Sequence, residues 1–315
     1  MAVDPVAGGN VPILDGAAIL ARTPGIHDIA DLVPYDLGLT PASHFTFPRL
    51  LEIAATIRAA ASDPDVDGVV VVQGTDTIEE TAFCWDLLYD GGAPVVVTGA
   101  MRSSSEAGYD GPANLIDAVR CAAAPALRGQ GVVVCLAGSI DAADDVSKTH
   151  ASSLTTFQSP NDGRLGVVSA GRVLVTRHRA GRRYVAADVA AEPIHLITAT
   201  VSMDGALLDA AVSLGARGII VAATGSGNPS ATLLAAGKRA MAAGVPLVLS
   251  TRAPAGRAGV GYAFPGGGAQ WVSAGALRAG SLSAIKARVA LALGVGAGLD
   301  RAELAALLAG PEEPE

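Results

Sequence analysis

The chain has 315 residues, which is enough for two domains with a sizeable core. Its formal net charge of −8 argues against a nucleic-acid partner, because phosphate backbones call for clustered Lys and Arg. No apolar run reaches the ~20 residues that a membrane helix needs, and no basic-then-apolar signal opens the chain, so we expect a cytoplasmic protein without a membrane partner.

Short apolar runs alternate with helix-like segments through the first half of the chain. The runs are rich in valine and predict buried parallel strands. The segments between them carry apolar residues at helical spacing. The strands are expected at residues 69–72, 94–98 and 131–136, and the helices at 49–61, 78–89 and 113–122. This β-α-β order predicts an α/β fold with a doubly wound, mostly parallel sheet.

The pattern changes between residues 163 and 187, where valines alternate with Gly, Arg and Ser as in antiparallel hairpins. The basic residues from Arg177 to Arg183 are predicted to form a solvated hairpin, with a nucleic-acid patch as the weaker alternative. The β-α order then resumes, with elements expected at 194–198, 206–214, 218–222, 231–243, 246–250, 285–293 and 301–309. We expect an N-terminal domain of residues 1–189 and a smaller C-terminal α/β domain of residues 190–315.

The three cysteines, Cys84, Cys121 and Cys135, are widely spaced and form no metal-ligand pattern. We expect them to be small buried thiols in a reducing compartment. The sequence contains no other ligand cluster either, so we expect neither a metal nor an organic cofactor.

A polar cluster follows the first valine run, at the point where the predicted strand ends. In a parallel sheet, ligands bind beyond the carboxyl ends of the strands. Thr77 and Glu80 fit a capping box, a structural role worth about 1 kcal/mol. Capping leaves Thr75 and Asp76 unexplained, and both lie near the positive end of the next helix, where anions are favoured.

A threonine hydroxyl needs a neighbouring base to act as a nucleophile. Lys148 is the candidate, because a lysine in a largely desolvated pocket loses its proton more readily. Asp76 can hold that lysine or bind a substrate's ammonium group. The residues alone leave a second interpretation open, in which Thr75 and Asp76 form an Asx turn and Lys148 is a surface lysine near Asp144 and Asp145.

Four stretches closely resemble the bacterial-type L-asparaginase family, which includes glutaminase-asparaginases. They are "VVVVQGTDTIEETA", "PVVVTGAMR", "DGPANLIDAV" and "DDVSKTHASSLTTFQSPNDGRLG", in order and in register. The resemblance implies a larger N-terminal α/β domain with a β-hairpin, a smaller C-terminal α/β domain, and an uncommon left-handed crossover. It also implies a homotetramer, built as a dimer of intimate dimers, with each site at a dimer interface.

The reaction that the resemblance implies converts L-asparagine and water to L-aspartate and ammonia through a threonine nucleophile. By position, Thr75, Asp76 and Lys148 match the family's threonine-aspartate-lysine group. In that group the lysine assists the threonine, and the aspartate also binds the substrate's α-amino group. Ser43 resembles the serine that holds the α-carboxylate.

Three more positions match substrate-binding residues of the family. Gly74 would present its backbone to the substrate, and Ala100 corresponds to a backbone carbonyl near the side-chain amide. Asn228 resembles a residue that the neighbouring subunit contributes; a turn residue is an equal alternative for it.

The sequence departs from the family at its start. Members carry a strand running into T-G-G-T-I-A, whose first threonine is the usual primary nucleophile, and nothing here corresponds to it. Val11 also takes roughly the place of a tyrosine that helps in many members. We therefore expect that the natural protein has a further N-terminal segment, and that the chain without it can be inactive.

Two alternatives to the asparaginase interpretation stay open. The substrate could be glutamine or the amide of a glutamate-charged tRNA, although the acidic balance counts against tRNA. The chain could also be a degenerate amino-acid-binding homologue that keeps Asp76 and Ser43 but does not turn substrate over.

Overall fold

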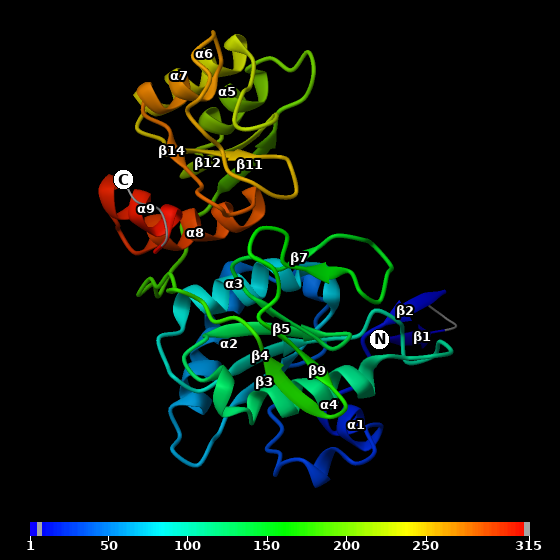
Figure 1. The fold of residues 1–315 in the computed structure, drawn as a ribbon. Helices are drawn as coiled ribbons and strands as arrows, with labels where there is room; N and C mark the ends of the chain where they lie inside the picture. The colour runs from blue at the N-terminus through cyan, green and yellow to red at the C-terminus, as the bar shows by residue number, and fades with distance from the viewer. Residues whose placement is uncertain (5–7, 312–315) are drawn as a thin grey trace. The chain divides into compact units, whose positions relative to one another are not determined.

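A computed structural model describes residues 1–4 and 8–311 of the chain. The chain divides into two compact units, Met1–Arg179 and Ala180–Glu315, which are called unit 1 and unit 2 and are described separately (Figure 1). The domain boundary expected near residue 190 falls within unit 2. Among the described residues, no helix combines the length and the apolar character needed to cross a membrane.

Unit 1 is built on a six-stranded mixed sheet. Its strands are β3 (Val69–Val72), β4 (Val95–Thr98), β5 (Val132–Leu136), β6 (Ser139–Ala142), β9 (Gly166–Ser169) and β10 (Arg172–Val175). They lie in the order β10-β9-β6-β5-β4-β3. The β3–β4 and β4–β5 pairs are parallel, and the other three pairs are antiparallel. The α/β class and the β-hairpin, here β9–β10, are confirmed, and the antiparallel part of the sheet is larger than the sequence predicted.

Helices cover both faces of this sheet. They are α2 (Phe47–Ala61), α3 (Ile78–Leu88) and α4 (Gly111–Ala122). Ala118 and Cys121 of α4 pack with Val96 and Val133 in one core cluster, while α3 covers the opposite face (Figure 1). Because β3, β4 and β5 are neighbours in that order, helices on opposite faces give the two crossovers opposite hands. One of the two connections is therefore left-handed, against the usual rule.

Strand β3 lies at an edge of the sheet and differs from its parallel neighbours. In the described part of the chain it pairs with β4 on one side. Its valines are half-buried and Val72 is 45% exposed, whereas β4 and β5 are buried throughout. The prediction that residues 69–72 form a buried strand is thus wrong in its burial, because an edge strand lacks a neighbour to cover it.

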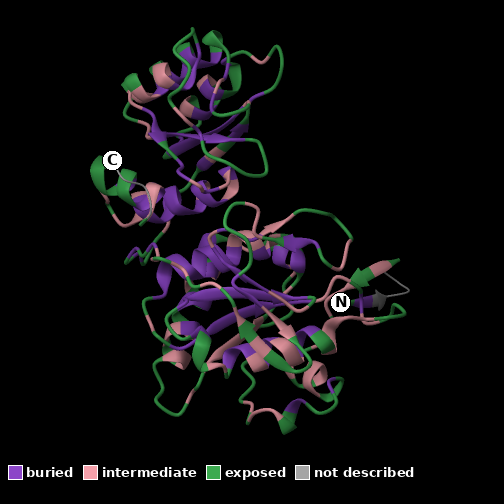
Figure 2. Cartoon of the chain, viewed as in Figure 1, coloured by how far each residue is buried: buried purple, intermediate pink, exposed green. Residues whose placement is uncertain are grey.

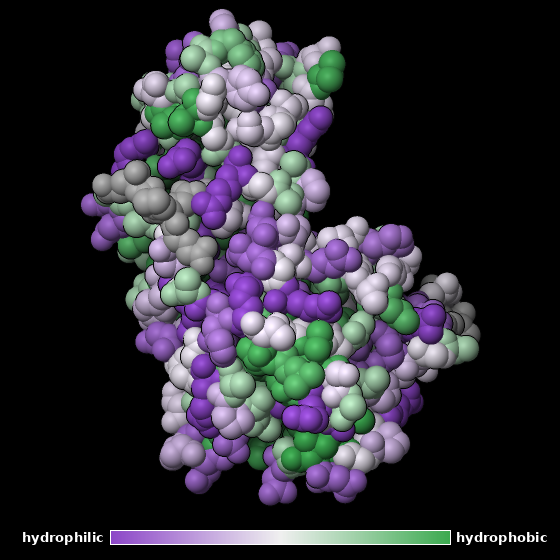
Figure 3. Space-filling model, viewed as in Figure 1, coloured by the Kyte–Doolittle hydropathy of each residue, from purple (hydrophilic) through white to green (hydrophobic). Residues whose placement is uncertain are grey.

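Short elements complete unit 1. They are the hairpin of β1 (Ala2–Asp4) and β2 (Gly9–Val11), helix α1 (Gly16–Ala21), the hairpin of β7 (Ser147–Lys148) and β8 (Phe157–Gln158), and 3₁₀ turns at Ile26–Asp28, Ala42–His44, Thr75–Thr77 and Pro125–Leu127. Hydrophobic side chains gather over β9 on the face shown in Figure 3. Leu174 of β10 is 40% exposed.

Unit 2 has a four-stranded, all-parallel sheet in the order β11-β12-β13-β14, as expected for a small α/β domain. Trp271 and Leu208 pack with the sheet in a core cluster on one face. The two central strands, β12 and β13, are buried along their whole length (Figure 2). The elements are β11 (Ile194–Thr198), α5 (Ala206–Ser213), β12 (Gly218–Ala223), α6 (Ala231–Ala242), β13 (Leu247–Thr251), α7 (Gly268–Ser273), β14 (Leu277–Arg278), α8 (Ala284–Gly296) and α9 (Arg301–Ala309).

The basic stretch from Arg177 to Arg183 is not a solvated hairpin, and that prediction is wrong. Strand β10 ends at Val175, before the stretch begins. The side chain of Arg179 is 4% exposed and Arg183 is 7% exposed. Both guanidinium groups are withdrawn from solvent because each contacts buried oxygen atoms of its own unit.

Candidate active site

The loop between β3 and α3 carries the first two predicted site residues. After Gly74 the chain makes the 3₁₀ turn Thr75–Thr77, which leads directly into α3. Thr75 is 8% exposed. Across from it, a Cβ at Gly99 would lie 2.5 Å from the Gln73 carbonyl oxygen, so only glycine lets the ends of β3 and β4 approach this closely.

Lys148 reaches this loop from the β7–β8 hairpin. Its Nζ donates to Thr75 Oγ1 at 3.0 Å and to Asp76 Oδ1 at 2.8 Å. The side chain of Lys148 is 13% exposed and that of Asp76 is 76% exposed. The structure thus brings a hydroxyl, an amine and a carboxylate together, with the carboxylate open to solvent.

The exposure of Asp76 affects what the cluster can do. An ion pair with one partner in water is weakened by solvent screening, so this pair contributes little to stability. The same exposure leaves Asp76 accessible to a second cation, such as the ammonium group of an amino acid. To act as a base towards Thr75, the Lys148 amine must turn its lone pair to the Thr75 hydroxyl, which lies within bonding distance.

Thr77 does not cap α3, and the capping-box prediction is wrong. Its side chain makes no capping bond, because its backbone (φ −121°, ψ 11°) is not in the extended conformation that caps adopt. The hydroxyl instead donates to the Ala42 carbonyl at 3.3 Å. This bond ties the Ala42–His44 turn, and with it the exposed Ser43, to the Thr75–Thr77 turn.

Ala100 and Asn228 lie on other segments than the β3–α3 loop and the β7–β8 hairpin. Ala100 is half-buried and follows β4, directly after Gly99. Asn228 lies in unit 2, where its Oδ1 accepts from the Gly268 N–H at 3.2 Å and its own N–H donates to the Thr224 carbonyl at 2.9 Å. These bonds fit the alternative of a turn residue and leave the intersubunit role a prediction.

Acidic residues that sequence reasoning did not select anchor the hairpin of Lys148. Asp141 accepts from the hydroxyls of Ser139 and Ser159 at 2.7 and 2.8 Å. Burial raises the pKa of Asp141, although these two hydrogen bonds act in the opposite direction. Asp145 accepts from the Asn161 backbone N–H at 3.2 Å and from its side-chain amide at 3.0 Å. In the sequence, Asp144 and Asp145 were considered only as neighbours of Lys148 in the alternative that makes it a surface lysine.

The cysteines offer no rival nucleophile. All three are free and buried, as predicted. Burial, and to a smaller extent the Glu80 carboxylate, raises the pKa of Cys84 to about 12, which keeps its thiol protonated. Cys121 and Cys135 lie 3.8 Å apart between their sulfur atoms, inside the core under α4. Within the described residues, His, Cys, Asp and Glu form no group that could hold a metal ion.

The site combines a buried threonine hydroxyl, a lysine bonded to it and an accessible carboxylate. It lies at the carboxyl end of a parallel strand, where α/β proteins bind their ligands. These features define an α/β protein with a hydrolase-type site. Residues 1–180 match the family described as "Asparaginase, N-terminal", and residues 193–308 match "Glutaminase/Asparaginase C-terminal domain". The chain belongs to this L-asparaginase family of amidohydrolases.

Relatives of known sequence and structure agree with this assignment. The chain is 34% identical to "Probable L-asparaginase" of Deinococcus radiodurans over 94% of this chain and 93% of that protein. It is 33% identical to "L-asparaginase" of Bacillus licheniformis over 80% of this chain and 79% of that protein. The solved structure of a "Probable Cytoplasmic L-asparaginase" from Campylobacter jejuni superposes with a TM-score of 0.86, at 27% identity and 94% coverage of both chains.

Proposed function

We propose that the chain hydrolyses L-asparagine to L-aspartate and ammonia, with Lys148 as base and with Thr75 as nucleophile in place of the threonine that is the family's usual primary nucleophile. The observation that carries the proposal is the pair of bonds from Lys148 Nζ to Thr75 Oγ1 and Asp76 Oδ1. Membership of the L-asparaginase family supports the choice of substrate.

In the first half-reaction, the neutral amine of Lys148 takes the hydroxyl proton of Thr75 while Oγ1 attacks the side-chain carbonyl carbon of asparagine. The developing oxyanion needs hydrogen-bond donors. Backbone N–H groups at the start of a helix have no intrahelical partner, and those of the Thr75–Thr77 turn are the candidates here. Lys148 then returns the proton to the leaving nitrogen, and ammonia departs to leave an aspartyl ester on Thr75.

In the second half-reaction, water resolves this ester. Lys148, neutral again, takes a proton from the water molecule as its oxygen attacks the ester carbon. The proton passes to Thr75 Oγ1 as the C–O bond breaks, which releases L-aspartate and restores the hydroxyl. The Lys148 amine thus acts as general base and then as general acid in each half-reaction.

Substrate orientation is proposed to come from groups around the cluster. The exposed Asp76 carboxylate would hold the α-ammonium group, and Ser43 would bind the α-carboxylate from the turn that Thr77 ties to the site. Backbone groups of Gly74 and Ala100 would face the substrate. Asn228 of a neighbouring subunit would complete the site.

The assembly and the compartment are proposed from the family resemblance and the cysteines. A homotetramer, built as a dimer of intimate dimers, follows from the family resemblance alone. A cytoplasmic location is supported by three free cysteines, which suit a reducing compartment. Light scattering on the purified chain measures the mass of the assembly directly.

A second candidate function is amino-acid binding without turnover. One observation favours it: the Asp76 carboxylate is 76% exposed and can reach the ammonium group of an amino acid, whereas Thr75 is 8% exposed. A ligand could therefore bind to Asp76 without bringing its side-chain amide into line with the Thr75 hydroxyl.

Ammonia release from L-asparagine, measured beside calorimetric binding of L-aspartate, separates the two functions. Loss of a general base should lower the turnover rate about a hundredfold or more in Lys148→Met. Such a fall supports the enzymatic function. Binding without ammonia release supports the binder instead. The same assay with L-glutamine tests the glutaminase alternative, where one methylene changes kcat/KM by only about 10- to 200-fold.

A further inference from the structure

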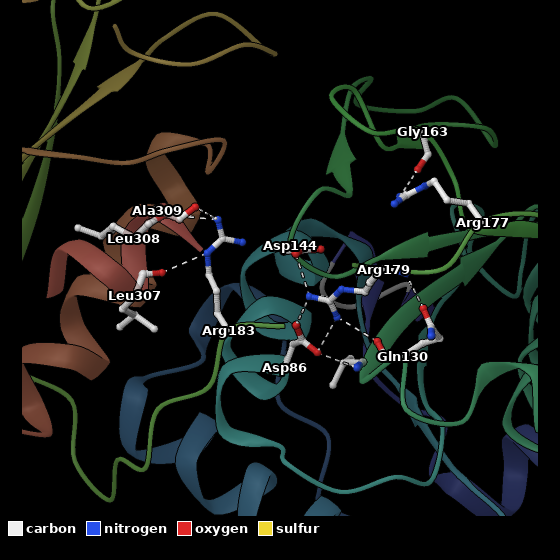
Figure 4. A network of polar contacts seen from close by, with 11 residues as sticks. Asp86, Gln130, Asp144, Gly163, Arg177, Arg179, Arg183, Leu307, Leu308 and Ala309 are labelled. Atoms are coloured by element: carbon white, nitrogen blue, oxygen red, sulfur yellow. Dashed lines mark hydrogen bonds and ion pairs between the residues drawn. The ribbon is translucent and has the colours of Figure 1, made fainter. Parts of the chain in front are cut away.

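A buried arginine joins two segments that lead to the proposed catalytic side chains (Figure 4). The side chain of Arg179 is 4% exposed. Its Nη1 and Nη2 donate to the two carboxylate oxygens of Asp86 at 3.1 and 2.8 Å, a bidentate pair. Nη2 also lies 2.8 Å from Asp144 Oδ2, and Nη1 donates to the Gln130 carbonyl at 3.0 Å.

Both carboxylates belong to segments that lead to the site. Asp86 lies near the end of α3, is fully buried, and also accepts from the Val132 N–H of β5 at 2.9 Å. Asp144 lies in the turn between β6 and β7, just before Lys148, and its side chain is 18% exposed. The guanidinium therefore fixes α3, the start of β5 and the turn that precedes Lys148 against one another.

The two segments form two arms that run from the arginine to the site. From Asp86 back to the start of α3, the helix spans about 12 Å. From Asp144 to Lys148, the chain can span at most about 14 Å. Arg179 joins the arms at one end, and the bonds of Lys148 to Thr75 and Asp76 join them at the other. A slip of one arm along the other would stretch the Lys148–Thr75 bond.

The ion pairs of Arg179 with Asp86 and Asp144 are suited to holding segments in position. A buried ion pair adds little stability compared with packed apolar side chains, but it favours one arrangement over others. The planar arginine fork fits a carboxylate in one orientation, which a lysine cannot reproduce. Burial by itself lowers the pKa of Arg179, yet the charges of Asp86 and Asp144 together raise it above its ordinary value, so the cation persists.

We propose that Arg179 is a positioning residue that, through Asp86 and Asp144, holds the Lys148 amine at bonding distance from Thr75. This inference rests on the proposed function for its kinetic consequence. The structural consequence, which is the placement of Lys148 in the free protein, is independent of the proposed function.

The kinetic test compares Asp144→Asn with wild type. The amide has the same size, Asp144 is partly exposed, and the Asp86–Arg179 pair remains, so the variant is expected to fold. We expect kcat for asparagine to fall about tenfold or more while KM stays within about threefold, because a misplaced base affects the chemical step more than binding. Arg179→Lys, which keeps the charge and loses the fork, should reduce kcat in the same way.

Arg183→Lys is the matched control. Arg183 is also buried, but its guanidinium donates to the carbonyls of Leu307, Leu308 and Ala309 at the end of α9 in unit 2 (Figure 4). This variant should lose stability and keep its kcat. An unchanged kcat in Asp144→Asn, or an equal fall in Arg183→Lys, would overturn the proposal.

A second readout does not depend on turnover. The chain has three lysines, Lys148, Lys238 and Lys286, so acetylation of each can be followed by mass spectrometry. Lys238 is exposed and serves as an internal reference, and Lys286 is 1% exposed. We expect Asp144→Asn to raise the initial acetylation rate of Lys148 relative to Lys238 at least about threefold, because the amine is no longer held against Thr75 and Asp76.

The two readouts separate the two proposals. A wild-type chain that releases no ammonia would refute the proposed function, and the acetylation ratio would then decide the positioning role alone. A ratio that stays the same in folded Asp144→Asn would refute the positioning role whatever the activity.

Discussion

Two loops follow parallel strands in this chain, and their threonines are used differently. After β3 in unit 1, the Thr75 hydroxyl bonds to an amine 73 residues further along the chain. After β12 in unit 2, the Thr224 hydroxyl donates to the Asn228 carbonyl within its own loop, at 2.6 Å. A hydroxyl bonded within its loop shapes the loop, whereas one held by a distant charged group is available for chemistry.

Matched replacement of the two threonines tests this difference most strongly. Thr75→Val should lower kcat by at least about a thousandfold, because it removes the proposed nucleophile. Thr224→Val should lower kcat by no more than about tenfold, because its hydroxyl shapes the loop of Asn228 and takes no part in the reaction. Steady-state ammonia release from asparagine measures both, and similar losses in the two variants would remove the contrast.

Replacing one aspartate in each unit tests whether Asp76 binds substrate, and a smaller effect is expected than for Thr75. Asp76→Asn should raise KM for asparagine roughly 10- to 100-fold, since a charged hydrogen bond to the substrate's ammonium is worth about 1.5–3 kcal/mol. Asp209, which pairs with Arg239 at 2.6 Å on the surface of unit 2, supplies the control. Asp209→Asn should leave KM unchanged, and an unchanged KM in Asp76→Asn would take Asp76 out of substrate binding.

Stability should show the reverse order of effects. Thr224→Val removes a hydrogen bond that shapes its loop and should cost about 1 kcal/mol in the free energy of unfolding. Thr75→Val removes a bond to a lysine that keeps its contact with Asp76, and should cost less. Urea denaturation of both variants measures the difference; a larger loss in Thr75→Val would contradict the assignment of roles.

The smallest effect concerns the hairpin that carries Lys148. Burial raises the pKa of Asp141 above its ordinary 3.8, so the folded chain binds a proton that the unfolded chain has already lost. Stability contributed by this group is therefore present below pH 3.8 and lost as the pH rises through the folded pKa. Asp141→Asn should remove this component, so its melting temperature should improve relative to wild type as the pH rises. A constant difference across that range would contradict the raised pKa.

The local spacing of apolar residues was sufficient to predict most helices and strands, but it could not predict which groups the polar side chains contact. The valine runs of β4 and β5 and the helical spacing of α2 to α4 are local signals, and each element lies where it was expected to within a few residues. Composition could not reveal that β3 lies at an edge, since position in a sheet depends on all its neighbours. The prediction of a solvated basic hairpin failed for the same reason, because the partners of Arg179, Asp86 and Asp144, lie far away in the sequence.

The site was predicted in part. Residue chemistry selected Thr75, Asp76 and Lys148, and the family resemblance supported this choice, because a threonine, a lysine and an aspartate in polar loops after strands are recognisable individually. The anchors Asp141, Asp145 and Arg179 were missed, since their role follows from what they contact and not from their residue type.

Thr75, activated by Lys148, is proposed to attack the side-chain amide of asparagine. Rapid acid quenching during turnover, followed by digestion and mass spectrometry, is the measurement that checks this step. We expect an aspartyl ester on the peptide that contains Thr75, absent in Thr75→Val. An ester on a different residue, or steady ammonia release by Thr75→Val, would contradict it.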